Sequence, residues 1–302
     1  MITGETSNQQ SVEVAGAAVS IAAGGPHMRQ THRAVLIGMA VAALAATGLV
    51  SPPTAQAGPN CTPDAVTAGL KAALGSPAPV GTPYSCAKTV YPGAKLRVAG
   101  SHGGAGGGCT ANFLFRGSND RIYLGTAGHC TLAATNMDGD RGEFRDPAMG
   151  ALVQDGNGTQ IGRVEYAIQQ GDFDIALIRL RQGITYDTAL PHWGPVTGIN
   201  GTTSGSPIEL RWVGHGTGVG NVLYARSGLA LGMPDANQVY ALGAIAPGDS
   251  GGPVVDGNGK AIGVNVAIGA SLNPTGVQII TRLAPQLEKA RHKTGITFTL
   301  LR

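Results

Sequence analysis

The feature that most limits the fold of this chain is a series of short apolar runs, each interrupted by Gly, Asn or Asp. Short strands bounded by turn residues give this pattern. Glycine accounts for 48 of the 302 residues, but 42% of the residues are hydrophobic, which is too many for a disordered chain. The sequence therefore predicts an all-β protein with one large domain or two small ones.

The short runs fall into two sets, separated by the linker-like segment Pro191-His192-Trp193-Gly194-Pro195. The predicted strands are residues 111–116, 121–126, 150–153, 160–166 and 174–180 in the first set, and 208–213, 220–226, 238–242, 253–255, 261–267 and 277–281 in the second. Asp256-Gly257-Asn258-Gly259 predicts a hairpin turn rather than a calcium loop. Residues 283–293 place their apolar side chains on one face, which predicts a short amphipathic helix.

One loop carries a serine among small and polar residues that are unsuited to a hydrophobic core. Its sequence is Ala246-Pro247-Gly248-Asp249-Ser250-Gly251-Gly252-Pro253. Glycine reaches backbone angles that other residues avoid, so this loop can aim several N–H groups at one point. The N–H groups of Gly248 and Ser250 can converge on one oxygen, which is the geometry of an oxyanion hole. A glycine-rich turn between two strands remains the alternative for the loop alone.

The same loop also satisfies Gly-x-Ser-x-Gly, the nucleophile elbow of α/β-hydrolases. That fold needs a helix directly after the serine, and an acid and a histidine later in the chain. Here Gly251-Gly252-Pro253 is a poor start for a helix, and the only later histidine is His292, in a charged C-terminal stretch. The sequence therefore disfavours an esterase-type hydrolase on an α/β fold.

A histidine and an aspartate precede Ser250 in the chain, within Thr126-Ala127-Gly128-His129-Cys130 and Asp174-Ile175-Ala176-Leu177. The order histidine, aspartate, serine is the chymotrypsin order among the convergent triads. Together with Gly248-Asp249-Ser250-Gly251-Gly252-Pro253, these segments resemble the three signatures of the chymotrypsin-like serine proteases. The pattern is most similar to bacterial streptogrisin-like secreted proteases, and it covers roughly residues 98–282.

The resemblance implies an all-β fold of two packed six-stranded antiparallel barrels with a short C-terminal helix. It implies that His129 accepts the proton of Ser250 and that Asp174 orients the imidazole. The oxyanion hole is then formed by the N–H groups of Gly248 and Ser250. Asp172 competes for the third role, but we expect Asp174 to be the buried carboxylate because it directly precedes the apolar run.

The same resemblance predicts the substrate pocket. The family position at the pocket base, six residues before the nucleophile, is Ala244, so cleavage after Lys or Arg is not expected. The wall is expected in residues 265–269, where Val266 or Ala267 replaces a serine that commonly supports the triad aspartate and Ile268 narrows the pocket. We expect a preference for small or medium apolar side chains before the cleaved bond.

The leading hypothesis is a secreted serine endopeptidase that cleaves polypeptides through an acyl-enzyme, with no cofactor. The alternative is a catalytically weak protease-fold protein that binds partners without cleaving them, as a result of the altered wall at residues 265–269. The formal net charge is +3, and Lys and Arg are scattered along the chain. The sequence therefore shows no basic patch of the kind that binds nucleic acid. We expect a monomer.

The N-terminal region has the form of an export signal. A basic segment at residues 28–33, an uncharged run at 34–50 and an Ala-x-Ala ending before Gly58 predict a signal peptide over residues 28–57. An uncleaved membrane anchor is the alternative, because the run is about as long as a bilayer span. We expect an extracellular protein with no stable membrane association after signal cleavage, and residues 1–27 as an upstream extension.

Three further segments complete the predicted organisation. Residues 58–97 are either a propeptide, in which case the protein is made as a zymogen, or an extension that the mature protein keeps. Residues 98–190 form the first barrel, with the histidine and the aspartate. Residues 191–302 form the second barrel, with the serine, and the C-terminal helix.

All four cysteines lie beyond the expected signal peptide, and an even number in an exported protein predicts two disulfides with three possible pairings. Pairing in chain order gives Cys61–Cys86 and Cys109–Cys130, and the second matches the bridge that the resembled family has beside its active-site histidine. A loop of that size adds about 3 kcal/mol in the chain-entropy model. A metal site is not expected, because the chain has no Cys-x-x-Cys and no histidine at ligand spacing.

Overall fold

A computed structural model describes ten segments of the chain, all within one unit of residues 54–302. The described residues are 61–63, 84–86, 90–99, 108–132, 142–146, 150–201, 208–216, 224–232, 236–268 and 277–302. The predicted upstream extension, the signal peptide and most of residues 58–97 lie outside them. Within the described segments, no helix is long and apolar enough to cross a membrane.

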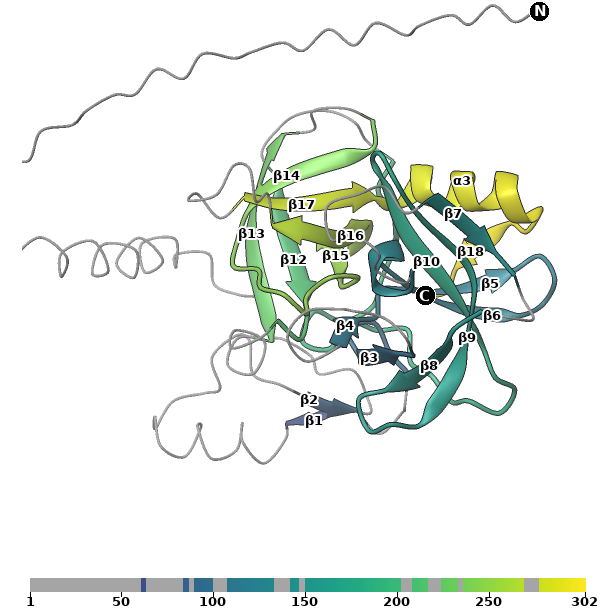
Figure 1. The fold of residues 1–302 in the computed structure, drawn as a ribbon. Helices are drawn as coiled ribbons and strands as arrows, with labels where there is room; N and C mark the ends of the chain where they lie inside the picture. The colour runs from purple at the N-terminus through teal and green to yellow at the C-terminus, as the bar shows by residue number, and fades with distance from the viewer. Residues whose placement is uncertain are drawn as a thin grey trace, which may run out of the picture. The chain divides into compact units, whose positions relative to one another are not determined.

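The first barrel is a ring of six antiparallel strands, to which β7 and β18 (Phe298–Leu300) are added (Figure 1). One extended segment closes the ring, because its first part, β4, pairs with β3 and its second part, β5, pairs with β6. The remaining pairings run from β6 through β10, β9 and β8 to β3. The bounds are β3 (Lys95–Val98), β4 (Gly108–Thr110), β5 (Leu114–Gly117), β6 (Ile122–Thr126), β7 (Gly142–Arg145), β8 (Leu152–Asp155), β9 (Gln160–Gln170) and β10 (Phe173–Leu180).

The second barrel is closed by the pairing of β16 with β17, which joins the two ends of the strand order β16-β15-β12-β13-β14-β17. All six strands pair antiparallel, and the two-residue β11 adds to β16 in parallel. The prediction of two six-stranded antiparallel barrels is therefore confirmed. The bounds are β11 (Gly198–Ile199), β12 (Glu209–Val213), β13 (Ala225–Gly232), β14 (Gln238–Leu242), β15 (Pro253–Asp256), β16 (Lys260–Ile268) and β17 (Val277–Arg282).

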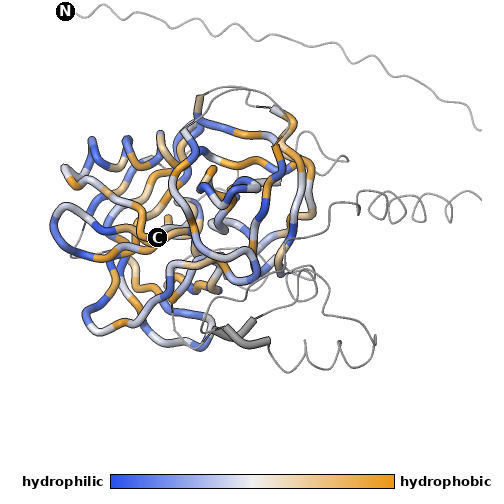
Figure 2. The backbone as a smooth tube through the Cα atoms, turned by 180° about the vertical axis from the view of Figure 1, so that it is seen from behind, coloured by the Kyte–Doolittle hydropathy of each residue, from blue (hydrophilic) through white to orange (hydrophobic). Residues whose placement is uncertain are grey.

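Alternation of polar and apolar residues explains why these segments form strands. Along β3, Lys95 and Arg97 are exposed while Leu96 and Val98 are buried, as expected for a strand with one face on a core. Figure 2 shows hydrophilic and hydrophobic stretches alternating along the barrel strands. Each barrel has its own interior, built around Leu124 and Ile178 in the first barrel and around Trp212 in the second.

A third apolar cluster combines residues of both barrels, among them Phe113, Ile175, Val213 and Val264. The two barrels therefore share a packed interface. The linker-like segment around residue 193 belongs to it, because Trp193 packs against this cluster. Trp193 Nε1 also donates to the Trp212 carbonyl at 3.1 Å.

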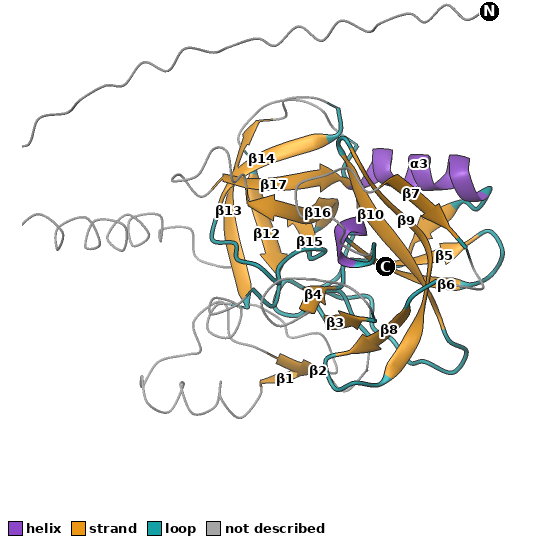
Figure 3. Ribbon diagram, viewed as in Figure 1, coloured by secondary structure: helices purple, strands orange, loops and turns teal. Residues whose placement is uncertain are grey.

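The C-terminal helix α3 (Leu283–Thr294) confirms the predicted helix over residues 283–293 (Figure 3). It contacts strands of both barrels. Gly295 ends the helix in a left-handed conformation, and its N–H donates to the Arg291 carbonyl at 2.8 Å. The chain then returns to the first sheet, where β18 (Phe298–Leu300) pairs with β5.

The largest differences from the predicted strands have local causes. Residues 220–223 of the strand expected at 220–226 lie outside the described residues. The described strand, β13, begins at Ala225 and continues to Gly232, and its glycines at 228 and 232 make this part of the sequence resemble a turn. β3 lies in the stretch that the sequence left as propeptide or extension, and its Leu96 is fully buried. The first barrel therefore includes residues upstream of position 98.

The turn at residues 256–259 has the predicted hairpin form. Asp256 ends β15, and its Oδ1 accepts the N–H groups of Asn258 at 2.9 Å and of Lys260 at 3.0 Å. Its Oδ2 accepts Asn200 Nδ2 at 2.8 Å. The carboxylate is thus occupied by protein donors that fix the turn between β15 and β16.

Candidate active site

The predicted histidine follows β6 in a single 3-10 turn, η1 (Gly128–Cys130). Its neighbour Gly128 has no room for a side chain, because a Cβ there would lie 1.9 Å from the Ile168 carbonyl oxygen and 3.1 Å from Asp174 Oδ1. The turn can therefore approach β9 and the start of β10 closely, which brings His129 to the predicted aspartate.

Asp174, the second residue of β10, makes two hydrogen bonds to His129. Its Oδ2 lies 2.7 Å from His129 Nδ1, and its Oδ1 accepts the His129 backbone N–H at 2.9 Å. The Asp174 side chain is only 13% exposed and the His129 side chain only 21%. The competing Asp172 is directed elsewhere, since its carboxylate accepts Asn237 Nδ2 at 3.4 Å and Gln238 Nε2 at 3.2 Å.

The predicted disulfide Cys109–Cys130 is present and joins η1 to β4. Cys109, His129 and Cys130 bring their ligand atoms within 4.8 Å of one another, but both sulfurs are committed to the disulfide, which leaves no thiolate for a metal. For the other predicted pair, the backbone register places Cys61 opposite Cys86 where β1 (Cys61–Pro63) pairs with β2 (Tyr84–Cys86), and their side chains lie outside the described part of the structure.

The serine loop connects β14 to β15 and is fixed to the first barrel through Thr110. The Thr110 N–H donates to the Ser250 carbonyl at 2.8 Å, and its Oγ1 donates to the Gly248 carbonyl at 2.8 Å. Gly251 packs on the end of β6, where a Cβ would lie 2.1 Å from Thr126 Oγ1 and 2.8 Å from the Ala127 nitrogen. The residue after Ser250 thus touches the segment that leads to His129.

Backbone N–H groups in this loop differ in a way that bears on the predicted oxyanion hole. Those of Asp249, Gly251 and Gly252 all donate to carbonyl oxygens of the protein. Those of Gly248 and Ser250 have no acceptor among the described residues. Gly248 has φ of +106°, which favours glycine and turns the loop. Two N–H donors beside the serine are therefore available to a ligand oxygen.

The trypsin family model matches residues 109–288, from the first cysteine of the disulfide into α3. The chain belongs to the trypsin family. This confirms the predicted enzyme class, a serine protease.

Bacterial proteases are among the solved structures similar to this trypsin-family chain. Thermobifida fusca protease A is 18% identical, with a TM-score of 0.47 over 71% of this chain and 100% of its own. Cellulomonas bogoriensis chymotrypsin is 17% identical (TM-score 0.44, 70% and 99%), and Nocardiopsis protease is 18% identical (TM-score 0.43, 70% and 100%). No curated protein sequence matches the chain.

The residues expected to form the substrate pocket of this trypsin-family chain lie along two segments beside the serine loop. Ala244 is partly buried, and its carbonyl accepts Arg226 Nη1 at 3.1 Å. Val266 is buried on β16, directly after Asn265, which exchanges backbone hydrogen bonds with Gly251 and Gly252. Ala267 and Ile268 continue β16, but their side chains lie outside the described part of the structure.

Asp249 carries the interaction that sequence reasoning did not find. Its carboxylate is fully buried and pairs with Arg226, with Nη2 at 2.5 Å from Oδ1 and Nη1 at 2.6 Å from Oδ2. The N–H groups of Gly216 at 2.7 Å and Ala246 at 2.9 Å complete its hydrogen bonding. Nothing in the sequence near Arg226 indicates this role.

Gln286 of α3 was missed as well. Its Oε1 accepts the Asp174 backbone N–H at 3.0 Å, and its Nε2 donates to the Asp172 carbonyl at 3.1 Å. The side chain is fully buried. It therefore holds the backbone on both sides of Phe173, where the turn leads into the strand that carries Asp174. The helix predicted from the sequence includes this position, but the prediction assigned it no role.

His215 lies behind the serine loop. A Cβ on Gly248 would lie 2.7 Å from the His215 carbonyl oxygen, and the His215 N–H donates to Thr110 Oγ1 at 3.1 Å. Burial lowers the pKa of His215 to about 4, and the positive charge of Lys95 acts in the same direction. The imidazole is therefore neutral at neutral pH.

Proposed function

We propose that this chain is a secreted serine endopeptidase in which His129, Asp174 and Ser250 form the catalytic triad. The observation that carries the proposal is the pair of hydrogen bonds between Asp174 and His129, next to a serine loop that contacts the segment leading to that histidine. A histidine held by a carboxylate through Nδ1 has its other ring nitrogen available as a base.

The proposed reaction begins when Ser250 Oγ attacks the carbonyl carbon of the scissile peptide bond. His129 Nε2 takes the hydroxyl proton, and the imidazolium so formed is stabilised by Asp174. The tetrahedral intermediate collapses as His129 returns the proton to the leaving amine, which leaves an acyl-enzyme. Water then attacks the ester with the same histidine as base, and the acid product and free Ser250 are released.

The N–H groups of Gly248 and Ser250 are proposed to bind the oxygen of the tetrahedral intermediate. Their lack of acceptors among the described residues supports this role. Donors that are already in place when charge develops on the oxygen need no reorganisation, and a single such donor is worth about 10²–10³ in kcat.

Secretion is proposed from the signal-like pattern at residues 28–57 and is supported by the disulfide, since disulfides persist in oxidising compartments. We also propose a preference for small or medium apolar side chains before the cleaved bond. The residue at the expected pocket base, Ala244, is uncharged, and Val266 on the expected wall is apolar. A panel of peptide substrates tests this. Efficient cleavage after Lys or Arg would contradict it.

The triad is tested by comparing two aspartate variants. Asp174→Asn should lower kcat by about 10⁴, because an amide no longer holds the tautomer that leaves Nε2 free to act as base. Asp172→Asn is the matched control and should retain activity within a few-fold, because its carboxylate bonds to Asn237 and Gln238 instead of His129. Equal loss in both variants would contradict the assignment.

A further inference from the structure

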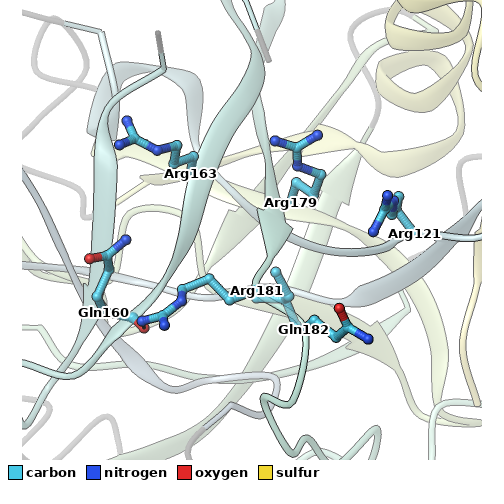
Figure 4. Close-up of a pocket in the computed structure, with 7 residues that line it drawn as sticks. Arg121, Gln160, Arg163, Arg179, Arg181 and Gln182 are labelled. Atoms are coloured by element: carbon cyan, nitrogen blue, oxygen red, sulfur yellow. Dashed lines mark hydrogen bonds between the residues drawn. The ribbon is translucent and has the colours of Figure 1, made fainter. Parts of the chain in front are cut away.

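Four arginines surround one hollow on the outside of the first barrel (Figure 4). The hollow has a volume of about 420 Å³, and none of its lining residues is acidic. It lies at the end of β10 opposite to Asp174, about 20 Å along the strand at 3.3 Å per residue, so it is separate from the proposed active site. The lining residues are Arg121, Gln160, Arg163, Arg179, Leu180, Arg181 and Gln182.

The register of the sheet concentrates these charges. Arg163 on β9 and Arg179 on β10 are direct cross-strand partners, and like charges in such positions destabilise a sheet. β6 runs antiparallel to β10, so Arg121, just before β6, comes to the same edge as Arg181, just after β10. Figure 4 shows the four side chains around the same space.

The protein orients two of these guanidinium groups without neutralising them. Arg163 Nη1 donates to the Gly150 carbonyl at 3.0 Å, and Arg181 Nη1 donates to the Gln160 carbonyl at 3.3 Å. Both acceptors are uncharged, and each guanidinium has five N–H groups in a planar fork, so most donors remain for a ligand. In the described residues, no carboxylate pairs with Arg121, Arg163 or Arg181.

In the part of the chain that the structure describes, one carboxylate forms an ion pair with an arginine of the cluster. Glu165 is buried, and its Oε2 lies 3.6 Å from Arg179 Nε. Among the described residues, the four arginines of this hollow therefore face a single carboxylate partner.

We propose that this hollow binds a compact oxyanion with two or more negative charges, of the phosphate or sulfate ester class. Such groups accept two parallel hydrogen bonds from an arginine fork. They also concentrate charge in a small volume, as the hollow requires. An acidic peptide fits less well, because its carboxylates are spaced along a chain and alternate in direction on an extended strand.

The test measures binding to the full chain by calorimetry. One arm uses inorganic pyrophosphate, and a second uses dextran sulfate with uncharged dextran as its control, which separates a free anion from ester groups on a polymer. A third arm uses hexaglutamate. The double variant R121Q/R181Q removes two exposed lining arginines, and R145Q/K260Q removes two exposed charges elsewhere. Unchanged melting midpoints would show that both variants fold.

Saturable binding of pyrophosphate or dextran sulfate, weakened about tenfold or more in R121Q/R181Q and unchanged in R145Q/K260Q, is the expected result, since each lost charged hydrogen bond is worth about tenfold. Three results would overturn the proposal: no saturable binding of either anion, equal weakening in the two double variants, or tighter binding of hexaglutamate than of both anions.

Discussion

Arg226 and Asp249 form a buried bidentate ion pair behind the loop that carries Ser250. Asp249 lies between Gly248 and Ser250, the two residues whose N–H groups have no acceptor among the described residues. The pair therefore fixes the backbone on which the proposed oxyanion hole depends. It also joins β13 of the second barrel to this loop.

Removing the arginine should damage stability and activity together. Arg226→Met leaves the Asp249 carboxylate buried without its countercharge, which typically destabilises a protein by about 3–5 kcal/mol. Urea unfolding and active-site titration measure the two effects. Arg291→Met is the matched control, because its partner Glu288 is exposed on α3, and it should leave the unfolding midpoint unchanged. A stable, fully active Arg226→Met protein would contradict this role.

The ion pair also bears on activation. Removal of residues 58–97 would create a new N-terminal amine. If the Asp249 carboxylate needed that amine as its ion-pair partner, the uncleaved chain would be inactive. Arg226 already forms an ion pair with this carboxylate in the uncleaved chain. Cleavage after Arg97 would moreover cut β3 within the first barrel. We therefore expect Arg97→Gln to react with a fluorophosphonate as readily as the unaltered chain, with labelling measured by mass spectrometry. Loss of labelling in this variant would show that cleavage after residue 97 is required.

Acid should destabilise the protein through His215. Its pKa is about 4 in the folded protein, below the ordinary value of 6.5, so between these values the unfolded chain binds more protons. The stabilising effect is complete above about pH 6.5 and is lost as the pH falls toward 4, at most about 3 kcal/mol.

Urea unfolding at several pH values measures this effect. His215→Leu should show a smaller loss of stability between pH 6.5 and 4 than the unaltered chain. His292→Gln, which removes an exposed imidazole, is the control and should keep the original slope in this range. Identical slopes in His215→Leu and the unaltered chain would refute the assignment.

Gln286 is expected to act as a positioning residue. Gln286→Met leaves the Asp174 N–H and the Asp172 carbonyl without partners, which should shift Asp174 and lower kcat by about tenfold or more, with KM little changed. Gln286→Glu keeps the acceptor for the Asp174 N–H but loses the donor, and should retain more activity. If both variants changed KM alone, Gln286 would not act through Asp174.

The sequence predicted those parts of the protein whose signals are local. β14 was predicted at the observed bounds, because Val239-Tyr240-Ala241-Leu242 is a short apolar run between turn residues, and the helix followed from its apolar face. β13 was misplaced because its glycines resemble turn residues. β18 is three residues long and pairs with β5, far away in the chain, so no local pattern reveals it.

The site shows the same division. His129, Asp174 and Ser250 lie in recognisable motifs, so the sequence alone was enough to propose them as the triad. Arg226 and Gln286 act on partners 23 and 112 residues away, at Asp249 and Asp174. Their roles depend on how the barrels and α3 pack, and a single sequence carries no signal for that.

The most direct test of the central claim is to treat the secreted protein with a fluorophosphonate and locate the label by peptide mapping. The account predicts one label, on Ser250, that disappears in Ser250→Ala and is strongly slowed in His129→Ala, because the hydroxyl reacts only when a base takes its proton. Label on another residue, or equally fast labelling of Ser250 without His129, would contradict it. A folded protein that takes no label would instead favour the catalytically weak binding protein.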